Sequence, residues 1–240
     1  MQHFVTGLVD YSHREAVHAT ISKSGWATMK TVCLLAQKGG TGKTTLCLHL
    51  AVLANELGYD SAIIDIDPQA SASAWKNRRQ RSSPEVFRHE ANDLSGVLTG
   101  LKREGKNLVL LDTAPHSSDE AAAAAALADL VLIVSRPAIL DLEAIGESVK
   151  IVKNKKAPAA VVLNACPPPH RGKETAIVSE AREALDVYGL PVSPVSISQR
   201  AAFSHALIDG RSVTEFDSTG KAAGEIRSLF TWLETECDLK

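Results

Sequence analysis

The stretch that decides the fold of this chain reads Gln37-Lys38-Gly39-Gly40-Thr41-Gly42-Lys43-Thr44-Thr45. It follows an apolar run at 31–36 that predicts a buried strand, and it precedes residues 46–57, which predict a helix. A glycine-rich turn in this position lets backbone N–H groups point at phosphate oxygens, and the helix N-terminus adds partial positive charge. The stretch therefore predicts a phosphate-binding loop.

Side chains in this loop add to what the backbone supplies. Lys43 can reach the terminal phosphates of a nucleotide, and the Thr44 hydroxyl can hold a magnesium ion. The predicted nucleotide-binding residues of the loop are Gly39, Gly40, Thr41, Gly42, Lys43, Thr44 and Thr45.

Apolar runs alternate with helical segments along the rest of the chain. This alternation implies the α/β fold of a P-loop NTPase, a mostly parallel twisted sheet with helices on both faces. The expected further strands are 61–67, 107–112, 129–134, 159–164 and, shorter, 192–197. The expected further helices are 70–81, 94–103, 119–127, 139–153, 173–188, 201–208 and 221–236.

Length and composition fit one domain. The 240 residues, 45% of them hydrophobic, suffice for one buried α/β core and little more. Residues 1–28 lack the apolar core of a signal peptide, and Met29 stands directly before the first strand. We therefore expect a poorly ordered extension over 1–28 and a single ATPase domain over 29–240.

Charge and cysteine content limit the possible partners. The formal net charge is −2, so any binding to nucleic acid needs a local basic patch. Four widely spaced cysteines form no C-x-x-C pair, which indicates reduced thiols in a cytoplasmic protein and disfavours an iron–sulfur relative. No apolar run approaches the ~18 residues that span a bilayer.

Acidic residues end two of the predicted strands. Asp65 and Asp67 alternate along one strand, so their side chains point to the same face, and Asp112 ends another. Ligands of parallel sheets bind at the carboxyl ends of the strands, where these acids, the loop and Asn164 all fall. Magnesium keeps several waters, so we expect Thr44 to bind it directly and Asp112 through water.

The lysine at the start of the loop, Lys38, makes the stretch resemble the deviant Walker A motif of the ParA/MinD family of ATPases. In that family this lysine reaches across a dimer interface to the nucleotide of the partner. The resemblance thus implies an ATP-dependent homodimer, with Lys38 joining Lys43 in catalysis and with ATP and Mg²⁺ as cofactors.

Two further motifs resemble this family. Residues 65–69, Asp-Ile-Asp-Pro-Gln, are similar to switch I, which implies that Asp67 positions the attacking water and that Asp65 supports the metal shell. Residues 112–115, Asp-Thr-Ala-Pro, are similar to switch II. Asn164 matches the family's adenine-contacting asparagine, and 196–200 matches, less specifically, a loop near the base.

The resemblance extends to about residue 236, and 209–213 and 221–226 look like the end of short, ParF-like ParA partition proteins. It implies weak ATP hydrolysis until a ParB-like or ribbon-helix-helix adaptor stimulates it, and nucleoid association through nonspecific DNA when ATP is bound. A basic cluster at 76–81 is another DNA candidate, or a partner-docking helix. The first candidates for DNA contact are Arg171, Lys173, Arg200, Arg211, Lys221 and Arg227.

Two alternative functions stay open. A MinD-like regulator that cycles on membranes needs a terminal amphipathic helix with a basic polar face. The segment 221–240 has the apolar spacing but a charge of −1, from three basic and four acidic side chains, so we expect it to pack onto the domain. A ParA-like ATPase that positions a protein cargo is the other alternative.

Overall fold

The structure, a computed structural model, describes residues 28–239. Its strands are β1 (Lys30–Leu35), β2 (Ser61–Asp65), β3 (Glu85–Arg88), β4 (Leu108–Asp112), β5 (Leu130–Ser135) and β6 (Ala159–Leu163). Its α-helices are α1 (Lys43–Glu56), α2 (Ser71–Arg78), α3 (Leu94–Arg103), α4 (Ser118–Leu127), α5 (Ile139–Lys155), α6 (Ala176–Leu185), α7 (Ala201–Ile208), α8 (Val213–Phe216) and α9 (Lys221–Glu236). Two short 3-10 helices are η2 (Ala91–Asp93) and η3 (Asp186–Tyr188). The expectation for residues 1–28 lies almost wholly outside the described residues.

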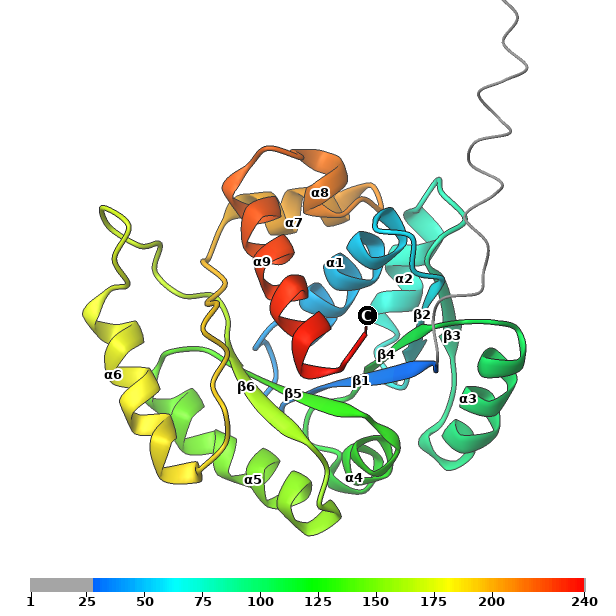
Figure 1. Ribbon diagram of the computed structural model, residues 1–240, viewed down its shortest axis with the longest axis horizontal. Helices are drawn as coiled ribbons and strands as arrows, with labels where there is room; N and C mark the ends of the chain where they lie inside the picture. The colour runs from blue at the N-terminus through cyan, green and yellow to red at the C-terminus, as the bar shows by residue number, and fades with distance from the viewer. Residues whose placement is uncertain (1–27, 240) are drawn as a thin grey trace, which may run out of the picture.

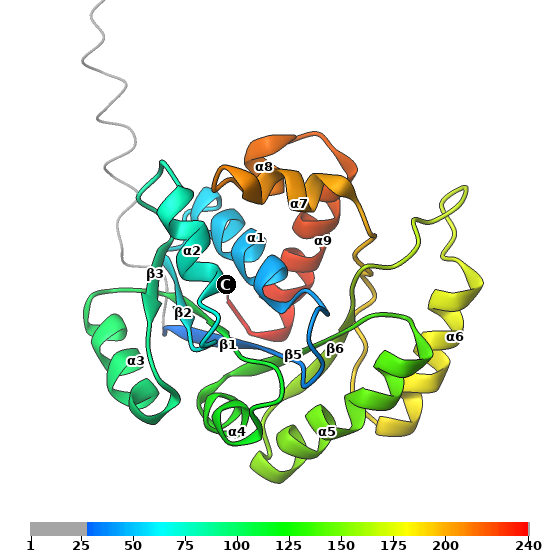
Figure 2. The same ribbon diagram turned by 180° about the vertical axis from the view of Figure 1, so that it is seen from behind.

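The strands form one parallel sheet in the order β3-β2-β4-β1-β5-β6. Helices α1, α2, α7, α8 and α9 cover one face, and α3, α4, α5 and α6 cover the other (Figures 1 and 2). From β1 the chain goes first to β2 on one side and later to β5 on the other. The loop after β1 therefore lies at the switch point of the sheet, where open α/β sheets bind ligands.

Strand β1 shows how both faces are filled. Val32 and Leu34 belong to the core under α1 and α9, whereas Cys33 and Leu35 belong to the core on the opposite face. This follows from the twofold alternation of side chains along a strand. All four side chains are fully buried, so the strand that carries the loop is held from both sides.

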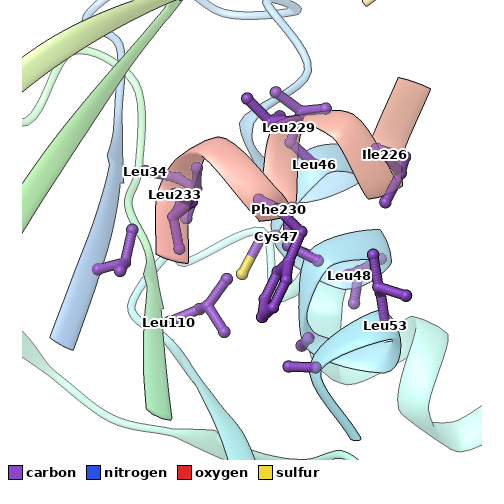
Figure 3. Packing of buried hydrophobic residues seen from close by; sticks show 14 of the residues in the cluster. Leu34, Leu46, Cys47, Leu48, Leu53, Leu110, Ile226, Leu229, Phe230 and Leu233 are labelled. Carbon is purple, nitrogen blue, oxygen red and sulfur yellow. The ribbon is translucent and has the colours of Figure 1, made fainter. Parts of the chain in front are cut away.

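Helix α9 turns its apolar face inward. Ile226, Leu229, Phe230 and Leu233 are each at most 1% exposed, and Figure 3 shows Phe230 beside Cys47 of α1. The expectation that this segment packs onto the domain is confirmed. Across the described residues, no helix combines the length and apolar character needed to cross a membrane.

The prediction of a strand at 192–197 is wrong. Single parallel bridges at Val192 and Ser198 join this segment to the chain in and just after β6, without a continuous ladder. Pro191 and Pro194 have no N–H to donate, so regular pairing is interrupted.

Other boundaries also differ from the predictions. The helix predicted at 173–188 begins only at Ala176, and the one predicted at 70–81 ends at Arg78. Strand β3 and helix α8 were not predicted, because each spans four residues and is too short to show a period. The apolar side chains of β3 are only half buried, which weakens the signal further.

The end of α2 is fixed to α8 and to the loop that precedes it. Arg79 makes two hydrogen bonds of 2.8 Å to the Glu215 carboxylate, and both side chains are almost fully buried. Gly210 has φ 76°, and a Cβ there would lie 2.4 Å from the Arg79 Cα. Because that neighbour is backbone, only glycine fits this contact.

Candidate nucleotide site at the carboxyl edge of the sheet

The loop between β1 and α1 offers its backbone to an anion. Gly40 and Gly42 have φ of 73° and 95°, a region that costs glycine little. Gly42 caps α1 without any side-chain hydrogen bond to the first turn. The first N–H groups of α1 are therefore not used by a cap, and the helix terminus favours negative charge there.

Lys43 is buried at the base of the loop. Its Nζ donates a hydrogen bond of 3.2 Å to the Ala36 carbonyl, and the residue is 6% exposed. Burial lowers the pKa of Lys43, and the charges of Asp112 and Asp67 oppose that shift. The ammonium thus sits among carboxylates at the end of β1, where a bound phosphate would add further negative charge.

Asp112 ends β4 in register with Asp65 of β2 and Leu34 of β1. It is fully buried, and neither carboxyl oxygen makes a hydrogen bond of normal geometry. Burial raises its pKa to about 7, while the Thr44 hydroxyl and Lys43 act in the opposite direction. A buried carboxylate lacking regular partners, next to a threonine hydroxyl, fits a hydrated magnesium ion.

No group of three or more His, Cys, Asp or Glu side chains suited to a metal occurs within residues 28–239. A magnesium ion that keeps its waters and binds phosphate oxygens needs only one or two protein ligands. Thr44 and Asp112 would therefore hold it together with the nucleotide.

The two acids of the 65–69 motif have different partners. Asp65 accepts hydrogen bonds from the Ser73 N–H at 2.9 Å and the Ser73 hydroxyl at 2.8 Å, which ties β2 to the start of α2. Asp67 accepts the Gln69 N–H at 2.9 Å, which closes the turn after β2. Asp65 thus ties β2 to α2, and its place in a metal shell stays a prediction.

Solvent reaches Asp67 from the β3 side. A cavity of about 630 Å³ borders this carboxylate, and a water that attacks a phosphate has room to enter there. Its lining is Ile66, Asp67, Pro68, Arg88, His89, Glu90, Ala91, Asn92 and Glu120.

Lys38 is held at the outer side of the loop. Its Nζ lies 3.0 Å from Asp141 Oδ2 at the start of α5, and Arg136 binds the same carboxylate at 2.9 Å. Burial raises the pKa of Asp141, but the hydrogen bonds from Arg136 and Lys38 outweigh it and leave the pKa below its usual value. The Lys38 side chain is 30% exposed and therefore accessible at the surface.

Asn164 lies against the back of the loop. Its Nδ2 donates a hydrogen bond of 2.7 Å to the Thr41 carbonyl, and a Cβ at Gly42 would lie 2.1 Å from that nitrogen. The structure thus brings Asn164 to the predicted nucleotide site on the β6 side. Contact with adenine stays a prediction.

A family model, the CobQ/CobB/MinD/ParA nucleotide binding domain, matches residues 32–213, which include the loop, Asp65, Asp67 and Asp112. The chain belongs to this family. As a ParA/MinD-family member it is a nucleotide-binding ATPase, and the fold and family that the sequence resembles are confirmed.

This ParA/MinD-family chain is similar to curated proteins and to solved structures. Maintenance of carboxysome distribution protein A of Gloeobacter kilaueensis is 31% identical over 213 residues, covering 87% of this chain and 94% of that protein. Protein IncC of Escherichia coli is 26% identical, covering 90% of this chain and 72% of that protein. A solved complex of Cyanothece McdA with ATP has a TM-score of 0.72, with 16% identity and coverage of 89% and 98%.

Three of the predicted DNA contacts in this ParA/MinD-family chain already have partners. Arg200 pairs with Glu225 at 2.6 Å, Arg211 with Asp209 at 2.8 Å, and Arg227 donates to the Ser218 carbonyl at 2.8 Å. The carboxylates compensate the charges of Arg200 and Arg211, which weakens their attraction for phosphates, whereas the bond to a neutral carbonyl leaves the charge of Arg227 in place.

The other three predicted contacts are exposed. Arg171 and Lys173 flank a tight turn with positive φ at Arg171 and Gly172, in the loop between β6 and α6, and Lys221 begins α9. In the 76–81 cluster, by contrast, Lys76 donates to the Pro84 carbonyl, and Arg79 is buried. DNA contact by any of these residues stays a prediction.

Sequence reasoning missed the partners of Lys38. Asp141 is 103 residues away in the chain, and its only local signal is that it is an acid in the first turn of a helix. Such acids usually complement the helix dipole, so nothing in the sequence pairs it with Lys38. Glu225, the partner of Arg200, was also missed, because the two residues are 25 positions apart in the chain and no local pattern pairs them.

Proposed function

We propose that ATP binding and hydrolysis control when this ATPase forms a homodimer. The dimer binds nonspecific DNA and partitions plasmid or chromosome DNA through a ParB-like or ribbon-helix-helix adaptor. The position of Lys38 carries the proposal. Its side chain is 30% exposed although its ammonium pairs with the buried Asp141, whereas Lys43 is buried at the base of the loop. A second lysine facing outward is suited to a nucleotide held by another protomer.

Hydrolysis would use groups from three strand ends. The start of α1 and Lys43 would hold the phosphates, Thr44 and Asp112 would hold the metal, and Asp67 would orient water. Magnesium, when bound, neutralises charge on the phosphates. The bonds between Asp65 and Ser73 keep the turn that carries Asp67 in place.

DNA binding would depend on a local patch, because the net charge of the chain is −2. Arg171, Lys173 and Lys221 are the exposed candidates, and they would contact phosphates without reading sequence. In cells, the ATP-bound protein is then expected on the nucleoid and the released protein in the cytoplasm.

A second candidate function is the positioning of a protein cargo. The 31% identity to a protein named for carboxysome distribution, over 94% of its length, favours it. Under this proposal the ATP and DNA steps are the same, and only the adaptor differs. A plasmid-loss assay in cells that lack the protein separates the two. The rate of plasmid loss rises in these cells only if the missing protein partitions plasmid DNA.

Co-sedimentation tests the shared steps. We expect the protein to pellet with DNA in ATP and Mg²⁺, not in ADP, and not with anionic vesicles. Vesicle binding in ATP would support the MinD-like alternative. Equal DNA binding in ATP and in ADP would contradict control of DNA binding by ATP.

A further inference from the structure

Glu225 of α9 holds a loop outside its own helix. Its carboxylate accepts hydrogen bonds from the Ser198 N–H at 3.0 Å and the Ser198 hydroxyl at 2.7 Å. It also accepts from Arg200 Nε at 3.0 Å and Nη2 at 2.6 Å. Four donors on one partly buried carboxylate exceed what a surface ion pair provides, since such pairs contribute little.

The segment that Glu225 holds runs along the end of β6. The Cys166 N–H donates to the Ile197 carbonyl at 2.9 Å, and the Gln199 N–H donates to the Cys166 carbonyl at 2.8 Å. Cys166 is two residues after Asn164, which binds the loop at the Thr41 carbonyl. A chain of hydrogen bonds and short backbone steps therefore runs from α9 to the phosphate loop.

Helix α9 is a rigid support for this carboxylate. Ile226, the next residue, is fully buried against the core that α1 shares, and Phe230 packs one turn further on (Figure 3). Helix α1 begins in the phosphate loop at Lys43. The phosphate loop and the segment that Glu225 holds are therefore both attached to the same packed layer of helices.

The charges around the loop indicate which end of a nucleotide meets this segment. Asp112 and the turn carrying Asp67 lie on the β2–β4 side, where metal and terminal phosphates belong. The nucleoside then extends to the opposite side, toward β6. There Asn164 presents an amide, and the two acids that contact the segment 196–200, Glu174 and Glu225, are paired with Arg182 and Arg200.

We propose that Glu225 is a positioning residue for the base: it fixes the segment 196–200 as one wall of the site for the purine of ATP. The inference rests on the proposed ATP site and adds to it a residue that touches neither phosphate nor metal. Loss of the carboxylate frees Ser198 and Arg200, so the wall moves while the phosphate loop stays intact.

The test compares two ligands that differ only in the nucleoside. Affinities of the full chain for ATP and for inorganic tripolyphosphate, both with Mg²⁺, are measured by calorimetry in wild type, Glu225→Gln and the control Glu236→Gln. The control makes the same change at an exposed position near the end of α9. We expect Glu225→Gln to weaken ATP about tenfold and tripolyphosphate less than twofold, and the control to change neither.

Equal losses for both ligands, or no loss, would overturn the positioning role. If Glu225→Gln does not fold, Ser198→Ala removes only the hydroxyl donor and is expected to shift the same ratio by a smaller factor. A wild type that binds neither ligand would instead overturn the proposed ATP site and this inference with it.

Discussion

At the scale of single residues, the two lysines of the loop differ in environment. Lys43 is 6% exposed at the base, and Lys38, whose side chain is 30% exposed, shares the Asp141 carboxylate with Arg136. A buried ammonium is suited to the protomer's own phosphates, and an accessible one to a ligand that arrives with another molecule.

Replacement of the outer lysine separates binding from dimerisation. Lys38→Ala is expected to keep ATP affinity within about threefold but to lose the ATP-dependent dimer, because Lys43 and the α1 terminus remain. Light scattering after size exclusion, with ATP or ADP, measures this. Lys153→Ala on the exposed end of α5 is the matched control, and a Lys38→Ala protein that still dimerises would refute the role.

Replacement of Asp67, the acid proposed to position water, is expected to separate ATP binding from hydrolysis. Asp67→Ala is expected to bind ATP normally and to lose hydrolysis by about 100-fold or more, the usual effect of removing such a group. Phosphate release and calorimetry measure the two properties. Asp209→Ala, at an exposed acid paired only with Arg211, provides the comparison. Normal turnover in Asp67→Ala would assign the water to another residue.

The sequence predicts a residue of this site when the residue ends a strand, because the strand then determines where the side chain lies. Asp112 and Asn164 end parallel strands, so they must reach the same edge as the loop. Asp141 and Glu225 approach through tertiary packing, from a helix start and from the last helix. No short sequence pattern predicts such tertiary contacts.

At the scale of elements, α1 contains an unusual buried group. His49 is fully buried, its Nδ1 accepts the Val213 N–H at 3.2 Å, and its Nε2 has no hydrogen-bond partner among the described residues. Burial lowers the pKa of His49 to about 3. The helix therefore folds with a neutral imidazole.

This burial predicts acid sensitivity. Unfolded His49 takes up a proton below its usual pKa of 6.5, and folded His49 does so only near 3, so stability falls as pH drops through this window. The slope is at most about 1.4 kcal/mol per pH unit. Urea unfolding at pH 5.0 and 7.0 measures it.

His49→Gln is the matched variant, because glutamine keeps an acceptor for Val213 and takes up no proton. Asp112 acts with the opposite sign, since its raised pKa stabilises the fold as pH falls through about 7. That contribution is present in both proteins and cancels in their difference. Equal pH dependence of the two proteins would exclude His49 as the source.

Elements were predictable where burial is regular. The central strands are apolar throughout and covered on both faces, so their runs are visible in the sequence. Strand β3, at the sheet edge, has half-buried side chains, and the prolines near 191–194 break what apolar composition alone suggests. The prediction thus fails at the β3 edge and in the segment beside β6, whereas β6 itself, a buried apolar run, was predicted.

At the scale of the whole molecule, a net charge of −2 makes DNA affinity depend on a few side chains. Lys173→Ala is expected to weaken DNA binding in ATP and to reduce the slope of log K against log salt by about 0.9, the value for one phosphate contact. Fluorescence anisotropy with a random duplex at several salt concentrations measures both. Lys102→Ala, exposed on α3, is the control, and an unchanged slope would remove Lys173 from the patch.

The contact at Gly210 limits which residues this position can accept. Any side chain there would displace the backbone of Arg79 at the end of α2, and the other end of α2 holds Asp65 through Ser73. Helix α2, eight residues long, connects these two contacts. A substitution of Gly210 is therefore expected to disturb the turn that carries Asp67 and to slow hydrolysis, although Gly210 itself has no proposed contact with nucleotide, DNA or adaptor.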